Sequence, residues 1–315
     1  MNPKISVIIP VKNEEIKIQK CLKAVFDQSL QPFEVIVVDG HSGDLTVENV
    51  KKFPVKIFYE DYRTRAGANK VGIDHAEGEY IAFTDADCIP DKYWLSNLYK
   101  ELKPGIAGVG GSIINLGEGL WEKSINVVFD SFLGSANSIQ GRLFSKKKFV
   151  KSISGCNSLY RKTDLLKSGG FNVTLTTAED TDLNNKMLKI GKLLYTPDAI
   201  IHHDHRRGLK GFKARMFQYG YGRAKSKLWD LQVIPPIVLI ILVISVFLNP
   251  LFLLAAISLY IIILILSGIY FSIKFSQIEY LISIPIVYFV EHFFYCMGYY
   301  KGLFSLGIEK LLSIK

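Results

Sequence analysis

Four short apolar runs, separated by segments with helical periodicity, dominate the first third of the chain. They read ISVIIPV (5–11), EVIVVD (34–39), VKIFYE (55–60) and YIAFTD (80–85). The runs are continuous rather than alternating, as expected of strands that are buried on both faces of a sheet. Strands that alternate with helices form βαβ units with right-handed crossovers. The pattern therefore predicts an α/β fold with a doubly wound, mostly parallel sheet.

The segments around and after these strands continue the pattern. Asn13 is a suitable N-cap for the first helix, which places Ile18, Leu22 and Val25 on one face. Further strands are predicted in IAGVGGSI (106–113), GCNSLYRK (155–162) and KLLYTPDAIIHHDH (192–205). AEDTDLNNKMLKIG (178–191) reads as a helix with Leu183, Met187 and Ile190 inward, ending at Gly191.

The hydropathy pattern changes abruptly after about residue 231, where charged residues become rare. Leu251–Phe271 is long enough to cross a bilayer, whereas Val233–Leu248 is shorter and begins near a Pro-Pro pair. Asn249-Pro250 predicts a turn between these segments, and a third candidate, Leu281–Phe304, contains Glu291 and His292. We therefore expect a soluble domain over 1–228, with an amphipathic, membrane-interfacial stretch at 120–151, and a membrane region of two to three helices over 229–315.

The charge distribution refines this picture. The formal net charge is +9, and a cluster of basic residues precedes the first apolar segment: Arg206, Arg207, Lys210, Lys213, Arg215, Arg223, Lys225 and Lys227. Positive residues beside a span mark its cytoplasmic side and attract anionic lipid headgroups. Because the cluster abuts the membrane region and the first residues do not resemble a signal peptide, we expect a multi-pass protein of the cell membrane with a cytoplasmic soluble domain. Nucleic acid is not an expected partner.

Carboxylates follow the predicted strands. Asp39 and Asp85 lie at strand ends, and Asp87 follows one residue later. Ligands of open α/β sheets bind outside the carboxyl ends of the strands. Two carboxylates so close together need a positive partner or exposure to water. They could hold a divalent cation, or they could cap a helix beginning near Pro90.

Six motifs together resemble family 2 glycosyltransferases of the GT-A fold. VIIPVKNEE, EVIVVDGHSGDLT, EYIAFTDADC, GCNSLYRK, AEDTDL and YGYGRA stand in the order of that family, over residues 5 to about 227. The subgroup that the chain most resembles is membrane-anchored and has C-terminal transmembrane helices. The resemblance implies a nucleotide-diphosphate sugar donor, a UDP- or GDP-sugar, and an inverting single displacement. No motif of processive members follows, which favours the addition of a single sugar.

The resemblance also implies the donor and metal sites. Donor-binding residues by this reading are Pro10, Glu14, Asp39, Arg65 and Asp85, with Asp39 on the base and Arg65 on a phosphate. Mg²⁺ or Mn²⁺ would be held by Asp87, with help from Asp85 and His203. His202 and His205 are weaker candidates. Two alternatives stay open: Asp39 could form a turn at its strand end, and the histidines could be a surface cluster.

The catalytic pair implied by AEDTDL is Glu179 and Asp180, with Asp180 as the general base. Thr177 and Asp180 could instead form a capping box. A base suits a hydroxyl acceptor, and the membrane region suits a polyprenyl-linked saccharide. The alternative is a polyprenyl-phosphate glycosyl synthase, whose acceptor oxygen is already ionised. A nucleotidyltransferase would normally carry a Gly-rich basic loop in place of PVKNEE, and a non-catalytic lipid-binding scaffold would be expected to lose Asp87 or Asp180.

Overall fold

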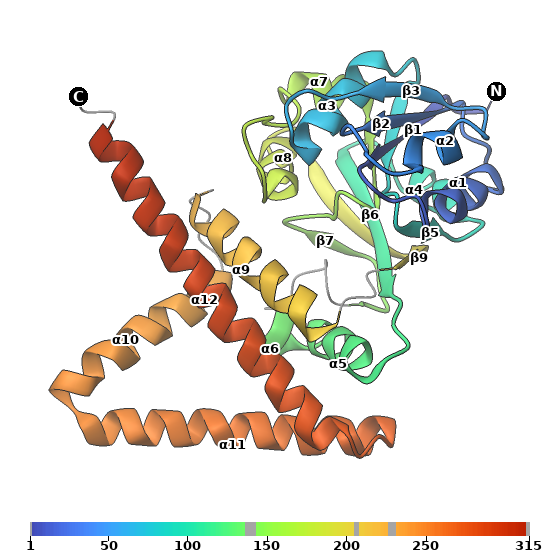
Figure 1. The fold of residues 1–315 in the computed structure, drawn as a ribbon. Coiled ribbons are helices and arrows are strands. Elements are labelled where there is room, and N and C mark those ends of the chain that lie inside the picture. Colours follow the sequence, from blue (N-terminus) through green and yellow to red (C-terminus); the bar gives the residue numbers. More distant parts are fainter. Residues whose placement is uncertain (1, 136–142, 205–207, 226–230, 313–315) are drawn as a thin grey trace. The chain divides into compact units, whose positions relative to one another are not determined.

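The computed structural model describes residues 2–135, 143–204, 208–225 and 231–312 (Figure 1). The chain divides into two compact units, one made of 1–115 and 138–205, the other of 116–137 and 206–315. This division differs from the expected boundary at residue 228. Residues 116–137 and the segment after 205 belong to the second unit because their helices share its apolar core. Each unit is described below by itself.

The first unit is built on one nine-stranded sheet with the order β3-β2-β1-β4-β8-β6-β9-β5, in which β7 also pairs with β9. The strands are β1 Ile5–Val11, β2 Glu34–Asp39, β3 Lys56–Tyr59, β4 Tyr80–Phe83, β5 Cys88–Pro90, β6 Ile106–Asn115, β7 Lys148–Val150, β8 Ser158–Arg161 and β9 Lys192–His203. Strands β1 to β4 pair in parallel, as predicted. In the other half only β6 and β9 are parallel, and β4–β8, β6–β8, β5–β9 and β7–β9 are antiparallel. The sheet is therefore mixed.

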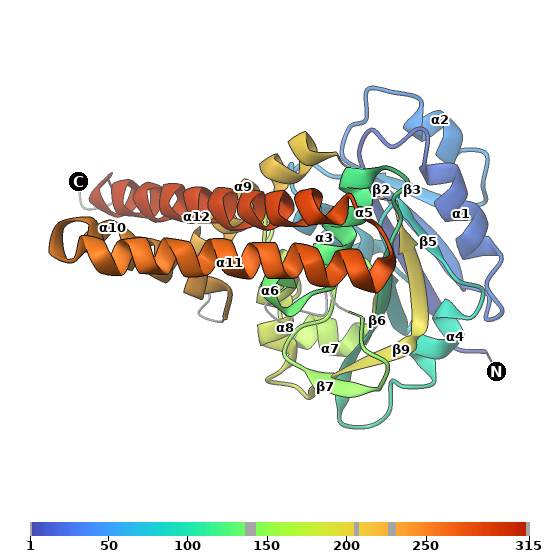
Figure 2. The ribbon, with the colours of Figure 1, turned by 90° about the horizontal axis from the view of Figure 1, so that it is seen from below.

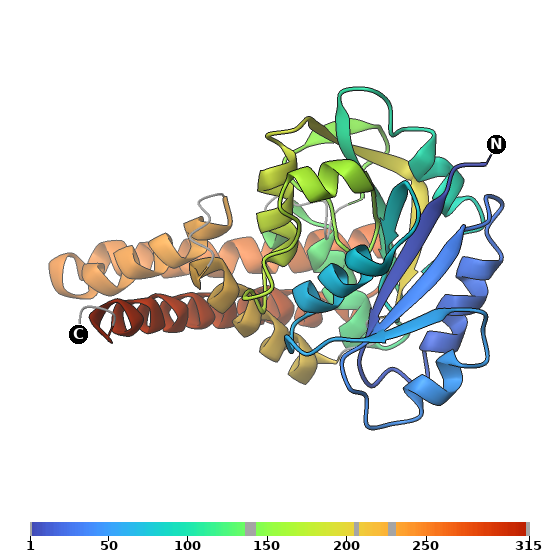
Figure 3. The ribbon, with the colours of Figure 1, turned by 90° about the horizontal axis from the view of Figure 1, so that it is seen from above.

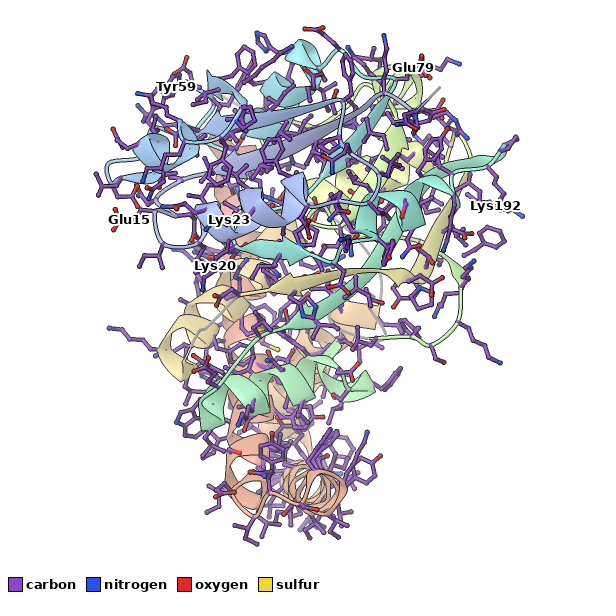
Figure 4. All side chains as sticks on the ribbon, turned by 90° about the vertical axis from the view of Figure 1, so that its right-hand side faces the viewer. Glu15, Lys20, Lys23, Tyr59, Glu79 and Lys192 are labelled. Carbon is purple, nitrogen blue, oxygen red and sulfur yellow. The ribbon has the colours of Figure 1, made fainter. Side chains whose placement is uncertain are left out.

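Helices cover both faces of this sheet (Figure 3). They are α1 Ile18–Phe26, α2 Thr46–Val50, α3 Arg65–His75, α4 Trp94–Tyr99, α7 Lys162–Lys167 and α8 Glu179–Met187. Alternate residues of β1 separate the two cores: Ile5, Val7 and Ile9 pack with α1 and α4, whereas Ile8 packs with α3 and α8. Lys20 and Lys23 lie on the exposed side of α1 (Figure 4). The predicted α/β fold with helices on both sides of the sheet is confirmed.

Two local predictions are wrong. Asn13 is not an N-cap, because α1 begins at Ile18 and Asn13 has a left-handed backbone with φ 55°. Its side-chain oxygen instead accepts a hydrogen bond from the Gly43 N–H at 2.9 Å. Asn13 thus holds the loop after β2. Ile190 lies beyond the end of α8 and is exposed.

The second unit is helical. It comprises α5 Leu120–Phe129, α6 Phe132–Ser135, α9 Leu209–Lys225, the 3₁₀ turn Leu231–Val233, α10 Ile234–Leu248, α11 Pro250–Phe275 and α12 Tyr280–Leu312 (Figure 2). Within the described part of the chain, three helices are long and apolar enough to cross a membrane: Leu231–Leu248, Pro250–Phe275 and Tyr280–Gly307. The predicted turn is confirmed, since Asn249 caps α11 by accepting from the Phe252 N–H at 3.1 Å.

Helices α9 and α12 are in backbone contact. A Cβ atom at Gly220 would lie 1.9 Å from the carbonyl oxygen of Tyr295, and one at Gly298 would lie 1.9 Å from that of Phe217. Small residues allow such close approach between apolar helices. The described members of the basic cluster lie on α9: Lys210, Lys213, Arg215, Arg223 and Lys225. Arg206, Arg207 and Lys227 lie outside the described residues. The cluster thus belongs to a helix that is packed along α12.

The polar pair in α12 has two different environments. His292 meets the Tyr260 hydroxyl at 3.0 Å and the Leu133 carbonyl oxygen at 3.3 Å, so it ties α12 to α11 and α6. Glu291 is buried, and its Oε2 atom has no hydrogen-bond partner among the described residues. One residue of the pair therefore joins helices, whereas the other carries a buried polar atom.

Candidate active site

The register between β5 and β9 brings Asp87 to His203. Cys88 stands opposite His203 in this antiparallel pair, and the Asp204 N–H donates to the Asp87 carbonyl oxygen at 2.8 Å. His203 Nε2 lies 3.1 Å from Asp87 Oδ1. Burial alone would lower the pKa of His203, but the hydrogen bond to Asp87 and nearby negative charges raise it. A positively charged group is therefore favoured beside Asp87.

Asp85, Asp87 and His203 form a candidate metal site at the carboxyl end of β4. One ligand atom from each residue lies within 4.8 Å of the others. Carboxylate oxygens with an imidazole nitrogen suit Mn²⁺ or Mg²⁺, so the donor set fits the implied cation. The capping alternative is wrong, because β5 follows the two carboxylates and α4 begins only at Trp94.

Arg65, the first residue of α3, connects three carboxylates. Its Nη2 lies 2.6 Å from Asp85 Oδ1, and its Nη1 lies 3.0 Å from Glu179 Oε1 and 3.4 Å from Asp180 Oδ1. The Thr64 hydroxyl caps this helix by accepting from the Gly67 N–H at 3.0 Å. The divalent cation expected as the positive partner of the Asp85–Asp87 pair is therefore not the sole one, because the Arg65 guanidinium lies against Asp85.

Asp180 lies in the first turn of α8, as predicted. Its Oδ2 atom accepts from the Gly155 N–H at 3.0 Å. A Cβ atom at position 155 would lie 2.2 Å from Asp180 Oδ1, so only glycine fits there. The capping-box alternative is wrong, because the N-cap residue is Ala178 and no side chain caps this end of the helix.

The backbone and charge around Asp180 are unusual. Ala178 has a φ of 63°, a conformation that costs energy for a residue with a Cβ and that often marks a functional site. Burial raises the pKa of Asp180 to about 6; Arg65 opposes this shift and Glu179 adds to it. A carboxylate with such a pKa can exchange a proton near neutral pH.

Asn157 anchors the loop that carries Gly155. Its Nδ2 atom donates to the carbonyl oxygens of Ser112 at 2.8 Å and Ala199 at 2.9 Å, and its Oδ1 accepts from Trp94 Nε1 at 2.8 Å. Neither Asn157 nor Gly155 is among the predicted site residues, although both lie in the GCNSLYRK motif. The available signal was the glycine in this strand-like run, because a glycine in a strand often marks a place where another group approaches the backbone closely.

The predicted base-binding residues lie at the carboxyl ends of β1 and β2. Val11 is paired with Asp39, and Pro10 with Val38. Both oxygens of Asp39 accept from Ser42, at 2.9 Å from its N–H and 2.5 Å from its hydroxyl, which is the turn that the sequence left open. A contact between Asp39 and a base stays a prediction.

Two other predicted residues lie apart from the metal site. The Glu14 N–H donates to the hydroxyl of Thr46, the first residue of α2, at 2.8 Å. His202 pairs with Asp91 at 3.0 Å, so His202 is separated from His203 by the alternation of the strand. His205 lies outside the described residues.

Known proteins are similar to this chain in sequence and in fold. The family model described as "Glycosyl transferase family 2" matches residues 6–168. A dolichyl N-acetyl-glucosaminyl phosphate 3-β-D-2,3-diacetamido-2,3-dideoxy-glucuronosyltransferase of Methanococcus voltae is 26% identical over 95% of this chain and 97% of its own length. A GalNAc(5)-diNAcBac-PP-undecaprenol β-1,3-glucosyltransferase of Campylobacter jejuni is 30% identical over 54% of this chain and 55% of its own.

Among solved structures, a mannosyltransferase from Pyrobaculum calidifontis in complex with GDP-Man and Mn²⁺ has a TM-score of 0.60. It is 20% identical and the match covers 91% of this chain and 87% of that one, so it establishes a shared fold. The family match spans β1 to β4, the Asp85–Asp87 pair and the loop of Gly155. The chain belongs to glycosyl transferase family 2, and it is a glycosyltransferase.

Proposed function

We propose that this enzyme transfers one sugar from a nucleotide-diphosphate sugar to a hydroxyl of a polyprenyl-linked saccharide, with inversion at the anomeric carbon. The observation that carries this proposal is one continuous polar cluster. Asp85, Asp87 and His203 converge on one point. Arg65 links Asp85 to the half-buried Asp180. A donor site and a base thus share one set of charges.

Asp87 and His203 would hold Mn²⁺ or Mg²⁺, with Asp85 as an additional ligand. When bound, such a cation neutralises the charge that develops on the departing diphosphate. Pro10, Glu14 and Asp39 are proposed to bind the nucleoside, since Pro10 and Asp39 lie at the carboxyl ends of β1 and β2 and Glu14 lies in the segment that follows β1. Arg65 is a proposed phosphate contact, and its three carboxylate contacts keep its guanidinium charged and oriented.

Asp180 is the proposed general base. It must accept a proton from a hydroxyl of ordinary acidity, and a pKa of about 6 keeps it ionised at neutral pH while retaining basicity. The Gly155 N–H fixes one of its oxygens. Arg65 Nη1 contacts both Glu179 and Asp180. The negative charge of Glu179 raises the basicity of Asp180, and by sharing the guanidinium Glu179 also weakens its stabilisation of the Asp180 carboxylate.

The acceptor and location are proposed from the relatives and the helical unit. The names of both relatives specify transfer to sugars already carried on dolichyl or undecaprenyl chains. Three membrane-capable helices suit such an acceptor. We place the enzyme in the cell membrane with its donor site on the cytoplasmic side. The basic residues of α9 would meet anionic headgroups. Of the predicted interfacial stretch 120–151, the helix α5 in the second unit would lie at the interface, whereas β7 at its other end belongs to the sheet.

The test is calorimetric titration of UDP and GDP into the full-length protein in detergent, with Mn²⁺ or with EDTA. We expect metal-dependent binding of one nucleotide, weakened roughly 10-fold or more in Asp87→Asn. Asp91→Asn is the matched control, because Asp91 pairs with His202 a few residues away. Equal affinity for all proteins with and without metal would refute the assignment.

A further inference from the structure

Two thiols approach His203 at the candidate metal site. Cys88 is the first residue of β5 and stands opposite His203 across the strand pair. Cys156 lies between Gly155 and the anchored Asn157. Sulfur atoms of both cysteines and a ring nitrogen of His203 lie within 4.8 Å of one another, and all three residues are buried. The proposed transfer reaction uses neither thiol.

These spacings suit a tetrahedral cation. Bond lengths of about 2.3 Å to sulfur and 2.0–2.1 Å to nitrogen put neighbouring ligand atoms roughly 3.3–3.8 Å apart. Asp87 Oδ1 lies 4.0 Å from Cys88 Sγ and 3.1 Å from His203 Nε2, so it is within reach as a fourth ligand. The three protein segments need to move by no more than about 1 Å to close around an ion of this kind.

The two ligand sets that share His203 differ in chemical preference. Asp85 and Asp87 offer hard oxygens, which suit Mg²⁺ and Mn²⁺, whereas two sulfurs and an imidazole select softer ions. Zn²⁺ also stands above Mn²⁺ in the general order of affinity. The binding of a divalent cation by two thiolates releases two protons and leaves a neutral set, which is tolerable in a buried place.

We propose that Cys88, Cys156 and His203 form a second cation site, specific for thiophilic divalent ions such as Zn²⁺ and Cd²⁺. An ion bound there takes His203 and competes for Asp87, so it weakens the neighbouring site for Mn²⁺ or Mg²⁺. Thiophilic ions therefore inhibit metal-dependent binding of the donor by occupying ligands of the neighbouring site. This consequence for the donor rests on the proposed function, whereas the existence of the thiolate site does not.

The site itself is tested with Cd²⁺, because cadmium bound to thiolates gives an ultraviolet charge-transfer band. The reduced, EDTA-treated full-length protein is titrated with Cd²⁺ alone. We expect a band that saturates at one equivalent, falls in Cys88→Ser and Cys156→Ser, and is unchanged in Cys21→Ser and Cys296→Ser. Cys21 is a close control, since its buried thiol donates to the Asp85 carbonyl oxygen at 3.3 Å.

Zn²⁺ on the unsubstituted protein gives an answer that does not depend on the folding of any variant. X-ray absorption at one equivalent should show two sulfur ligands at about 2.3 Å. A shell of oxygen and nitrogen alone, or a cadmium band that survives both cysteine substitutions, would overturn the site.

The competition is measured by repeating the Mn²⁺–nucleotide titration with one equivalent of Zn²⁺. Affinity should fall roughly 10-fold or more in wild type and should hold in Cys156→Ser. An unchanged wild-type affinity would overturn the inhibition. Absence of any Mn²⁺-dependent nucleotide binding, beside an intact cadmium band, would instead refute the proposed function and leave the thiolate site standing.

Discussion

Each of the two units places a glycine where no side chain fits, with opposite consequences. In the first unit Gly155 brings a backbone N–H to the carboxylate of Asp180. In the second, Gly220 and Gly298 bring the backbones of α9 and α12 together. The first close approach fixes an oxygen of half-buried Asp180, the proposed base, whereas the second packs two helices together. Substitutions at these positions should therefore separate chemistry from stability.

Among the glycine substitutions, the largest effect is expected from Gly155→Ala. Its Cβ would meet Asp180 Oδ1 at 2.2 Å and push the carboxylate away. A displacement of about 1 Å at a reacting group can cost on the order of 100-fold in turnover, and we expect at least that. The measurement is sugar transfer per folded molecule, with Mn²⁺–nucleotide affinity recorded beside it. Gly43→Ala, where a Cβ would meet nothing within 4 Å, is the control. Normal turnover in Gly155→Ala would show that this contact does not position the base.

Gly298→Ala tests the other side of the comparison. A Cβ 1.9 Å from the Phe217 carbonyl oxygen must force α9 and α12 apart, and overpacking of this kind costs about 1–3 kcal/mol. The thermal midpoint in detergent should fall while Mn²⁺–nucleotide affinity stays near wild type. Gly307→Ala, on the same helix with nothing within 4 Å, should not lower the midpoint. Equal midpoints for both variants would contradict the tight packing of the two helices.

Turnover and folding stability should also depend on pH in different ways. Because the pKa of Asp180 is raised to about 6, turnover should fall as the pH drops through 6 and the base becomes protonated. Stability runs the other way: a raised folded-state pKa favours the protonated form, so this contribution is full below the ordinary value of 3.8 and is lost as the pH rises through 6. Rate and thermal midpoint against pH, measured for wild type and Asp180→Asn, would show both trends. A wild-type rate that does not change between pH 5 and 8 would contradict the assignment.

The smallest effect is expected at Glu291. Its buried Oε2 has no partner among the described residues, so Glu291→Met should raise stability by roughly 1 kcal/mol. The neighbouring His292→Phe should lower it, because the side chain of His292 meets Tyr260 and Leu133. Thermal midpoints of the two variants provide the comparison. A lower midpoint in Glu291→Met would indicate that the carboxyl group has a structural role.

The sequence was most informative where apolar runs were continuous. Strands β1 and β2 have the predicted bounds because their side chains are buried on both faces and leave a strong local signal. The antiparallel half of the sheet was harder to predict from the sequence, because β5 and β7 have three residues each and depend on pairing with β9. The packing of α9 along α12 rests on glycines far apart in the chain, which no local pattern connects.

The site divides in the same way. Asp85, Asp87, Asp180 and His203 were found through motifs, and the structure brings them together. Arg65 was predicted as a phosphate contact, but its contacts with three carboxylates were not predicted, because these partners come from two distant segments. Gly155 was overlooked because its importance lies in the space that it leaves open. The contacts of Arg65 and Gly155 join segments that are distant in the sequence, so local spacing could not predict them.

The central claim is that Asp180 removes a proton from a hydroxyl acceptor, and Asp180→Asn tests it most directly. The substitution keeps size and the hydrogen bond from Gly155 but removes basicity. Turnover per folded molecule should fall by about 10²–10⁴-fold while Mn²⁺–nucleotide affinity and thermal midpoint at neutral pH are maintained. Asp182→Asn, at a half-buried i,i+4 pair with Lys186 on the same helix, should leave turnover near that of wild type. Near-wild-type turnover in folded Asp180→Asn would contradict the base assignment and favour an acceptor that is already ionised, such as a polyprenyl phosphate.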